Sequence, residues 1–408
     1  MRVLQVNVTQ NTGSTGRIAE AIGQSVIKDG GESYVAYGRD YNPDGMQSLI
    51  YRVGNNLDTY SHVLKTRLFD GHGLASKRAT KQFVNWTQKL QPDIIHLHNI
   101  HGYYLNYPIL FDFLKQYKRP VVWTLHDCWA FTGHCSHFES IGCNLWKTEC
   151  RCCPNKLAYP KSIGLDNSRR NFRLKENYFT SLQGLLTLVP VSNWLCKLLN
   201  LSFFKDIGSI EVIKNGINLS LFKPQQGNHL YLPFTLPKNI KHFYLSVSQK
   251  GLEDIKYFSS RYLEKDEAII VVGLSKEEIR HSRQSRKIFA LGKIDSNSMT
   301  KIYSLCDAYL NFTHGDTYPT TNLESIASGT PVITYETGGS PESITNDTGF
   351  VVQKGDYSAV RNALNIIRSR GKDYYSIKCR QYAELHFDIN KCLKMYINLY
   401  SHLLNPIK

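Results

Sequence analysis

Two acidic residues bracket the stretch Asp316-Thr-Tyr-Pro-Thr-Thr-Asn-Leu-Glu324, and this stretch decides how the second half of the chain folds. The apolar run Ala308-Tyr-Leu-Asn-Phe312 just before it predicts a buried strand. The polar loop that follows is expected to end in a helix that starts between Pro319 and Thr321. Asp316 then lies in the loop, while Glu324 lies about one turn into the helix, where its side chain can point back to the same end. The stretch therefore predicts a strand-loop-helix unit that gathers two acids.

The start of this helix is a candidate phosphate site. Backbone amides in the first turn of a helix have no partner within the helix, and the helix dipole makes that end positive. An anion such as phosphate is favoured there. The alternative is an ordinary loop followed by a helix with a capping acid. The candidate residues of this phosphate site are Tyr318, Pro319, Thr320, Thr321, Asn322 and Glu324.

The length and composition indicate a globular protein of two domains. At 408 residues the chain exceeds the usual size of a single core. Hydrophobic residues make up 42% and charged residues 20%, which excludes a disordered or fibrous chain. No apolar run approaches the ~18 residues that span a bilayer. The N-terminus alternates like a strand and lacks an apolar signal region. We therefore expect a cytosolic protein.

The charge of the chain favours anionic partners. Lys and Arg number 49 against 34 Asp and Glu, which gives a formal net charge of +15. No zinc-finger, RNA-binding or helix-turn-helix signature is present, so we expect no nucleic acid. A membrane surface that carries an anionic or lipid-linked substrate suits the charge better, which would place the protein peripherally at the inner face of the membrane. A basic surface that is merely solvated is the alternative.

A glycine-rich loop follows the first predicted strand, Val3 to Val8. The loop, Thr9-Gln-Asn-Thr-Gly13-Ser-Thr-Gly16-Arg17, leads into an amphipathic helix. Strand, glycine turn and helix make up the phosphate-binding arrangement of a doubly wound α/β domain. Gly13 and Gly16 are therefore candidate phosphate-binding residues. The next segment, residues 41–80, has no pattern that assigns its structure.

Polar residues follow two further predicted strands. The run from Pro92 leads into His98 and His101, and Val121-Val-Trp-Thr-Leu125 runs directly into His126-Asp127. Ligands of doubly wound folds bind beyond the carboxyl ends of parallel strands, so His126 and Asp127 are candidate catalytic residues. Asp127 either fixes the histidine ring or accepts a proton from a hydroxyl. Packing is the alternative role for these histidines.

Six of the ten cysteines fall between Cys128 and Cys153. A C-x2-C clamp with two further thiols has the spacing of a tetrahedral structural zinc site. Clustered cysteines in a cytosolic chain favour metal over disulfides. Reduced structural thiols and redox chemistry are the alternatives. The candidate zinc ligands are Cys135, Cys143, Cys150 and Cys153.

These motifs carry a family resemblance. The acid-x7-acid stretch Asp316 to Glu324 resembles the signature of retaining nucleotide-sugar glycosyltransferases with the GT-B fold. The block from Leu125 through the cysteines to Pro160 resembles a narrower branch, the bacterial family-four enzymes of capsule and colanic-acid-like exopolysaccharide assembly. The resemblance implies an α/β protein with two Rossmann-like domains facing across a cleft. The implied parts are an acceptor-side domain (1–224) with a cysteine-rich insert (128–154), a linker (225–240), a donor domain (241–385) and a last helix (386–408) that crosses back.

The resemblance also implies roles for residues. Asp316, a candidate catalytic residue with His126 and Asp127, would hold the donor sugar, Glu324 the donor ribose, and His126 the sugar face, with no metal required for catalysis. The candidate donor-binding residues would be Gly13, Gly16, Lys250, Tyr318, Pro319, Thr320, Thr321, Asn322 and Glu324. The family's first acid is usually Glu, which here is the shorter Asp. Its Arg and Lys clamp on the diphosphate is reduced to Lys250, because the Arg position falls on Leu245. One lost charge-assisted contact, worth about 1.5 to 3 kcal/mol, predicts weaker donor binding.

The implied activity is a retaining hexosyl transfer from a nucleotide-diphosphate sugar to a hydroxyl of a saccharide acceptor, which we expect to be lipid-linked. Two alternatives share the fold. One is a nucleotide-sugar epimerase or a phosphorylase. The other is a degenerate subunit that binds a glycan or a partner without turnover, which the reduced clamp favours.

Overall fold

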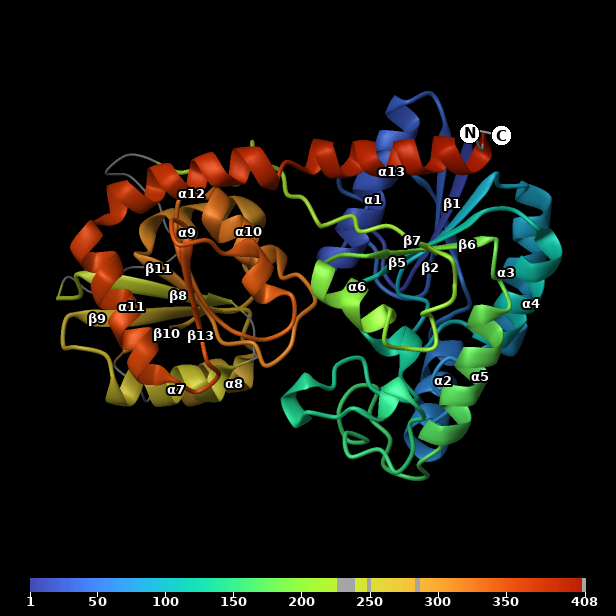
Figure 1. Cartoon of the computed structure of the whole chain (residues 1–408), viewed down its shortest axis with the longest axis horizontal. Coiled ribbons are helices and arrows are strands. Elements are labelled where there is room, and N and C mark those ends of the chain that lie inside the picture. Colours follow the sequence, from blue (N-terminus) through green and yellow to red (C-terminus); the bar gives the residue numbers. More distant parts are fainter. Residues whose placement is uncertain (226–238, 248–250, 283–286, 406–408) are drawn as a thin grey trace. The chain divides into compact units, whose positions relative to one another are not determined.

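The computed structural model describes residues 1–225, 239–247, 251–282 and 287–405. The chain forms two compact units (Figure 1), which are described one at a time. The first unit contains Met1–Lys214 and Cys392–Lys408, and the second contains Asn215–Lys391. The boundary therefore lies at Lys214, ten residues before the expected end of the first domain at position 224. Most of the expected linker lies outside the described residues.

The first unit is a parallel sheet covered by helices. Its described strands pair in the order β3-β2-β1-β4-β5-β6-β7, and every pairing is parallel. The order reverses direction between β1 and β4, which makes their carboxyl ends the place where a doubly wound sheet binds ligands. The elements are β1 (Arg2–Asn7), α1 (Gly13–Lys28), β2 (Glu32–Tyr37), β3 (Leu49–Arg52), α2 (Asn56–Phe69), α3 (Lys77–Leu90), β4 (Ile94–Leu97), α4 (Tyr107–Tyr117), β5 (Val121–Leu125), η1 (Trp129–Phe131), η2 (Glu139–Ile141), η3 (Leu145–Lys147), α5 (Ser168–Thr180), β6 (Leu186–Pro190), α6 (Asn193–Leu199), β7 (Ser209–Ile210) and α13 (Ile389–Leu404).

The second unit repeats this plan. Its described strands pair in the order β10-β9-β8-β11-β12-β13, again all parallel. The reversal falls between β8 and β11, so the acid-bracketed stretch, which follows β11, lies at the switch point of this sheet. The elements are β8 (His242–Val247), α7 (Leu252–Arg261), β9 (Glu267–Val272), α8 (Lys276–Ser282), β10 (Ile288–Ala290), α9 (Ser296–Leu305), β11 (Ala308–Asn311), α10 (Thr320–Ala327), β12 (Val332–Tyr335), η4 (Ser340–Ser343), β13 (Gly349–Val352), α11 (Tyr357–Arg370) and α12 (Lys372–His386).

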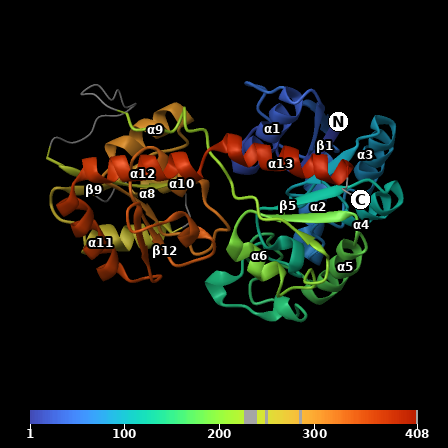
Figure 2. The same cartoon turned by 45° about the horizontal axis from the view of Figure 1, so that its top comes forward.

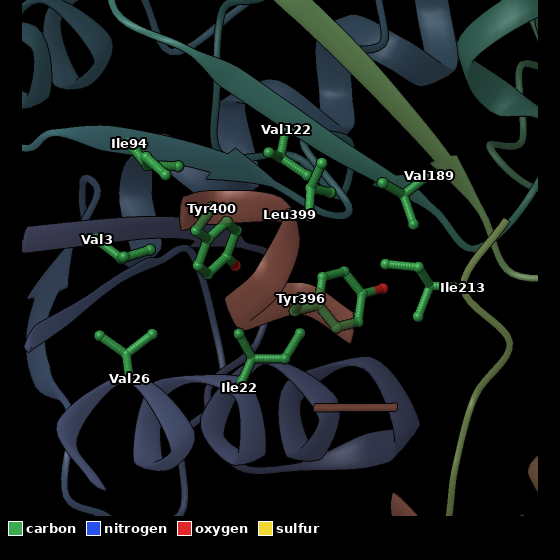
Figure 3. Packing of buried hydrophobic residues seen from close by; sticks show 10 residues of the cluster. All are labelled: Val3, Ile22, Val26, Ile94, Val122, Val189, Ile213, Tyr396, Leu399 and Tyr400. Carbon is green, nitrogen blue, oxygen red and sulfur yellow. The ribbon is translucent and has the colours of Figure 1, made fainter. Parts of the chain in front are cut away.

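The last helix, α13, completes the core of the first unit. Figure 1 and Figure 2 both show it alongside α1. Tyr396, Leu399 and Tyr400 recur at helical spacing, and this apolar stripe packs into the core of the sheet (Figure 3). The residues that surround the stripe are Val3, Ile22, Val26, Ile94, Val122, Val189 and Ile213. Burial of this stripe explains why the end of the chain groups with the first unit.

Two polar contacts fix α13 in this core. The Tyr400 hydroxyl lies 2.5 Å from Nδ1 of His96, and the Tyr396 hydroxyl lies 3.0 Å from that of Thr124. His96 and Thr124 are themselves linked at 2.8 Å. All four side chains are buried, so each polar atom needs such a partner. No helix in the described part of the chain is long and apolar enough to cross a membrane.

Candidate active site

The acid-bracketed stretch folds as a strand-loop-helix junction in the second unit. β11 ends at Asn311, one residue before the predicted end, and α10 begins at Thr320 with Pro319 as its extended N-cap residue. Asp316 lies half-buried in the loop, where its Oδ1 accepts a bond from the Tyr318 amide at 3.3 Å. Asp316 and the first turn of α10 are thus placed at the same end of the sheet, as the sequence predicts.

The backbone of Asp316 is held by a close approach of the turn after β12. The Gly339 amide donates to the Asp316 carbonyl at 2.9 Å. Gly338 has φ +59, and a Cβ at this position would lie 2.0 Å from the same carbonyl oxygen. Only glycine allows this approach, both for its backbone conformation and for space. The Gly338-Gly339 pair therefore positions the acid.

The first turn of α10 offers fewer amides than predicted. The Asn322 amide donates to the Pro319 carbonyl at 3.1 Å, so the prediction that it is unpaired is wrong. A tight three-residue bond at the helix start uses this donor. Among the described residues, the amides of Thr320 and Thr321 have no backbone partner. These two amides are the ones that can meet an anion.

The side chain of Asn322 has a structural part. It is fully buried, accepts a bond from Asn311 Nδ2 at 2.8 Å, and donates to Ser343 Oγ at 3.1 Å. These bonds tie α10 to β11 and to η4. Glu324, half-buried one turn further, accepts a bond from the Tyr303 hydroxyl at 3.2 Å. The helix start is therefore held in place by its own polar network.

The loop after β8 lies against the loop after β11. Gly251 has φ +83, and a Cβ there would lie 2.3 Å from the Phe312 carbonyl oxygen. Lys250, the predicted phosphate contact, lies outside the described residues. Leu245, where the family resemblance places Arg, is fully buried in β8 and cannot replace that cation at the surface. The described part of this unit therefore keeps the close loop-to-loop contact, and position 245 does not supply the second clamp residue.

Asp254 and His314 support the same loop, and the sequence analysis missed them. His314 Nε2 lies 2.8 Å from Asp254 Oδ2, and the hydroxyls of Tyr335 and Tyr357 donate to Oδ1 at 3.1 and 2.7 Å. Burial alone would raise the pKa of Asp254, but the bonds from Tyr357, His314 and Tyr335 lower it overall. In the sequence, the one feature that points to this network is the acid Asp254, in the first turn of helix α7.

The glycine-rich loop of the first unit leads into α1 at Gly13. Gly13 is exposed with φ +67, and a Cβ there would contact nothing within 4 Å, so its backbone conformation is what requires glycine. Gly16 is buried, and a Cβ there would lie 2.9 Å from Thr9 Oγ1. Gly16 therefore serves close packing of the turn, while Gly13 is the glycine that lies open at the helix start.

Asp127 pairs with a different histidine from the one expected. Its Oδ2 lies 2.9 Å from His101 Nε2, and its Oδ1 accepts a bond from the Trp129 amide at 2.9 Å. Burial would raise the pKa of Asp127, but His101 and the amide hold it below its ordinary value. A carboxylate so stabilised is a weak base. The geometry therefore favours positioning of His101 and of the turn at Trp129.

His126 is instead linked to His98 and Gln5. His98 Nδ1 lies 3.1 Å from His126 Nε2, and His98 Nε2 lies 3.0 Å from Gln5 Oε1. Gln5 Nε2 donates to the Ala19 carbonyl at 2.7 Å, which orients its amide. Burial lowers the pKa of His98 well below its ordinary value and that of His126 to about 4. Both rings are therefore neutral near pH 7.

The predicted zinc ligands gather without forming a site. Cys135, Cys143, Cys150 and Cys153 line one small cavity of about 10 Å³, roughly the space that one water molecule needs. A hydrogen bond between thiols raises the pKa of Cys135 and lowers that of Cys153 to about 7. In the part of the chain that is described, no three His, Cys, Asp or Glu side chains converge to hold a metal ion. The thiols as they stand do not fit tetrahedral coordination, and zinc stays a prediction.

Two Rossmann-like domains with parallel sheets, the second with an acid-bracketed helix start at its switch point, are the architecture of the GT-B fold class. The chain belongs to glycosyltransferase family 4, whose model matches residues 16–221. A second model, glycosyl transferases group 1, matches residues 246–368. The two matches cover most of both units.

Relatives and solved structures agree with this class. A protein of Escherichia coli (strain K12) named as a colanic acid biosynthesis glycosyl transferase, WcaC, is 23% identical over 374 residues, which cover 87% of this chain and 88% of that protein. Sucrose-phosphate synthase from Thermosynechococcus elongatus superimposes with TM-score 0.71 at 16% identity, covering 98% of each chain. HepE from Anabaena, in complex with UDP and glucose, does so with TM-score 0.62 at 15% identity over 98% of this chain and 99% of that one. At these identities the solved structures show the fold.

Proposed function

We propose that this glycosyltransferase moves a hexose from a nucleoside-diphosphate sugar to a hydroxyl of a saccharide in cell-surface polysaccharide synthesis. The observation that carries the proposal is the junction between β11 and α10. Asp316, the amides of Thr320 and Thr321, and Glu324 lie on one short strand-loop-helix segment. A carboxylate can hold a sugar hydroxyl, an anion site can hold a diphosphate, and a second carboxylate can hold the ribose hydroxyls, which is the order that the family resemblance implies for this segment.

The relatives support the finer parts of the proposal. HepE holds UDP and glucose in its complex, which favours a uridine nucleotide as a first donor to test. The name of the Escherichia coli relative favours an acceptor in exopolysaccharide assembly. A growing saccharide of this kind is expected to be lipid-linked, which agrees with the net charge of +15.

We propose that transfer proceeds with retention by attack from the face that the leaving group occupies. The bond between the anomeric carbon and the diphosphate oxygen breaks, and its electron pair stays on the phosphate. The acceptor oxygen forms the new bond, and its proton passes to the departing phosphate. Asp316 holds the donor sugar, Glu324 the ribose hydroxyls, and Lys250 with the amides of Thr320 and Thr321 takes up the phosphate charge.

Thermal unfolding in the presence of a panel of nucleotide sugars tests donor binding. A ligand at about 100 times its Kd adds about 2.7 kcal/mol to the free energy of unfolding of the folded protein. Turnover of the best donor is then compared in wild type and Asp316→Ala. Undiminished turnover in a folded Asp316→Ala variant would remove the central role of this acid.

One observation favours a second candidate function, a subunit that binds without turnover. The position of the second clamp cation is occupied by Leu245, which is fully buried. Calorimetry with nucleoside diphosphates separates the two candidates. Binding of none of them, in a protein that still binds saccharide, favours the non-catalytic subunit.

A further inference from the structure

Helix α2 turns its apolar side outward. In the part of the chain that is described, its only buried residues are the polar His62 and Thr66. Its large apolar residues recur at spacings of three and four, so they share one face of the helix. The exposed fractions of these side chains are 78% for Leu57, 70% for Tyr60, 59% for Leu64 and 40% for Leu68. A surface helix of a globular domain normally shows the reverse pattern.

Polar anchors hold this orientation. His62 Nδ1 lies 2.8 Å from Ser76 Oγ, and His62 Nε2 accepts a bond from the Gly73 amide at 3.0 Å. At the N-terminus of α2, Asn55 and Asp58 form a capping box. Rolling the apolar face inward would break both bonds of a buried imidazole. The outward apolar face is therefore built into the fold of the first unit.

A second segment extends this face. The amides of Ile163 and Leu165 donate to the carbonyls of Arg67 at 2.8 Å and Leu68 at 2.9 Å. Gly164 allows the contact, because a Cβ there would lie 2.1 Å from the Leu68 carbonyl oxygen. We call the resulting surface the apolar face; it consists of Leu57, Tyr60, Leu64, Leu68, Phe69, Ile163 and Leu165, each at least 40% exposed.

Basic residues border the apolar face. Lys65 and Arg67 are exposed on α2 itself. Asn167 Nδ2 donates to the Phe69 carbonyl at 2.8 Å, which joins the end of α2 to the start of α5. A surface hollow of about 550 Å³ lies at this start of α5. It is lined by the cations Arg169, Arg170 and Arg173 and by the carboxylate of Asp166. Glu149 pairs with Arg169 at 2.8 Å and with Arg173 at 2.5 Å on the surface, so the three arginines exceed the two acids by one charge. Positive charge thus adjoins the apolar side chains.

We propose that the apolar face and its basic border are a docking surface for an anionic phospholipid bilayer. The apolar side chains enter the boundary between headgroups and acyl chains, where the apolar area that they bury adds to the attraction between basic residues and anionic lipid. The lysine and arginines meet lipid phosphates, for which the arginine fork is well shaped. A second copy of the chain fits less well, because a symmetric dimer through this face would bring two basic borders together. Docking goes beyond the proposed transfer reaction, since it needs neither donor nor turnover.

Vesicle flotation with the full-length protein tests this inference. The probes are vesicles of phosphatidylcholine alone and of phosphatidylcholine mixed with phosphatidylglycerol. We expect binding to the mixed vesicles that weakens as salt is raised. Leu64→Asp should reduce the partition coefficient about tenfold or more, since burial of a leucine side chain is lost. Arg170→Glu should reduce it about fivefold or more.

Matched controls lie on the second unit. Ile377 is 60% exposed, nearly the same as Leu64, and does not belong to the apolar face, so Ile377→Asp changes net charge and surface hydropathy in the same way without altering that face. Lys378→Glu is the matched control for Arg170→Glu. Both controls should bind the mixed vesicles like wild type, and circular dichroism should show that all four variants are folded.

Four results would overturn the proposal. The first two are that wild type does not bind the mixed vesicles, or that it binds neutral vesicles equally well. The third is that Ile377→Asp loses as much binding as Leu64→Asp. The fourth is that the protein binds no vesicles and sediments as a dimer that Leu64→Asp dissociates. Failure of the transferase proposal is distinguishable, because the thermal response to nucleotide sugars is measured without vesicles. A protein that binds vesicles and no donor keeps the docking surface and loses the proposed reaction.

Discussion

The approach of Gly338 to Asp316 makes a sharp test of the proposed donor site. In Gly338→Ala the new Cβ would start 2.0 Å from the Asp316 carbonyl oxygen, whereas real Cβ atoms essentially never come closer than 3.0 Å. The loop at Asp316 must therefore move by roughly 1 Å. A misplacement of about 1 Å in a reacting site can cost about 100-fold in rate. We expect a loss of that order in turnover with the best nucleotide sugar.

Gly355→Ala is the matched control. Gly355 has φ +81 in the same unit, and a Cβ there would contact nothing within 4 Å. Both substitutions place alanine in the left-handed region, at a cost of about 1 to 2 kcal/mol in the free energy of unfolding. Only Gly338→Ala adds a clash with the loop of Asp316. The control should therefore lose stability and keep its turnover.

The assays are urea unfolding and steady-state turnover of both variants. The difference between the two variants, and not the loss of stability that they share, reports on the position of Asp316. Equal turnover in Gly338→Ala and Gly355→Ala would refute the reasoning. The close approach would then have no bearing on the donor site.

Three further predictions concern the rest of the chain. The free energy of unfolding should fall as pH drops below 6.5, by up to about 1.4 kcal/mol per pH unit for each buried histidine. The unfolded chain binds protons on these histidines in this range. The folded chain binds them only near the lowered pKa, about 4 for His126 and about 3 for His96. Urea unfolding across this range measures the slope, and a flat profile contradicts it. Tyr400→Phe should lower the free energy of unfolding by about 1 to 3 kcal/mol, since buried His96 loses its 2.5 Å partner, whereas Tyr60→Phe, with a side chain 70% exposed, should change it little. Equal effects would argue against the buried bond. If the four clustered cysteines bind zinc, elemental analysis of purified protein should find it in stoichiometric amount and lose it in Cys143→Ser/Cys150→Ser; a zinc-free wild type would favour reduced thiols.

The periodicity of apolar residues predicts the buried strands well, but it left the exposed helix α2 of the first unit unassigned. The buried strand before Asp316 and the start of α10 follow from an apolar run and a helix signal, and both lie within one residue of the prediction. Residues 41–80 gave no assignment, yet they form β3, α2 and the start of α3. The reason is physical: α2 buries only His62 and Thr66, so the apolar pattern that marks a packed helix points to solvent. A pattern rule that assumes an apolar interior would place Leu57, Tyr60 and Leu64 inside the protein, whereas all three are exposed.

Contacts between separate loops were beyond the sequence as well. Asp127 follows His126 directly, so a pairing of neighbours was the natural expectation. The side chain instead reaches His101, at the end of the adjacent strand β4, because the carboxyl ends of neighbouring parallel strands lie closer in space than the sequence shows. The same holds for Asp254 and His314, which are 60 residues apart. The sequence pattern therefore predicts which residues lie at the edge of the sheet. Which side chains pair there depends on tertiary packing.

The link from Gln5 through His98 fixes what His126 can do. Gln5 Oε1 can only accept, so His98 Nε2 carries the hydrogen of that 3.0 Å contact. Neutral His98 then has a lone pair on Nδ1, and the hydrogen of the 3.1 Å contact belongs to Nε2 of His126. Because burial keeps His126 neutral near pH 7, its Nδ1 carries a lone pair and accepts hydrogen bonds. A sugar that meets this nitrogen must offer a hydroxyl hydrogen, so His126 is suited to orient a hydroxyl group and unsuited to protonate a leaving group.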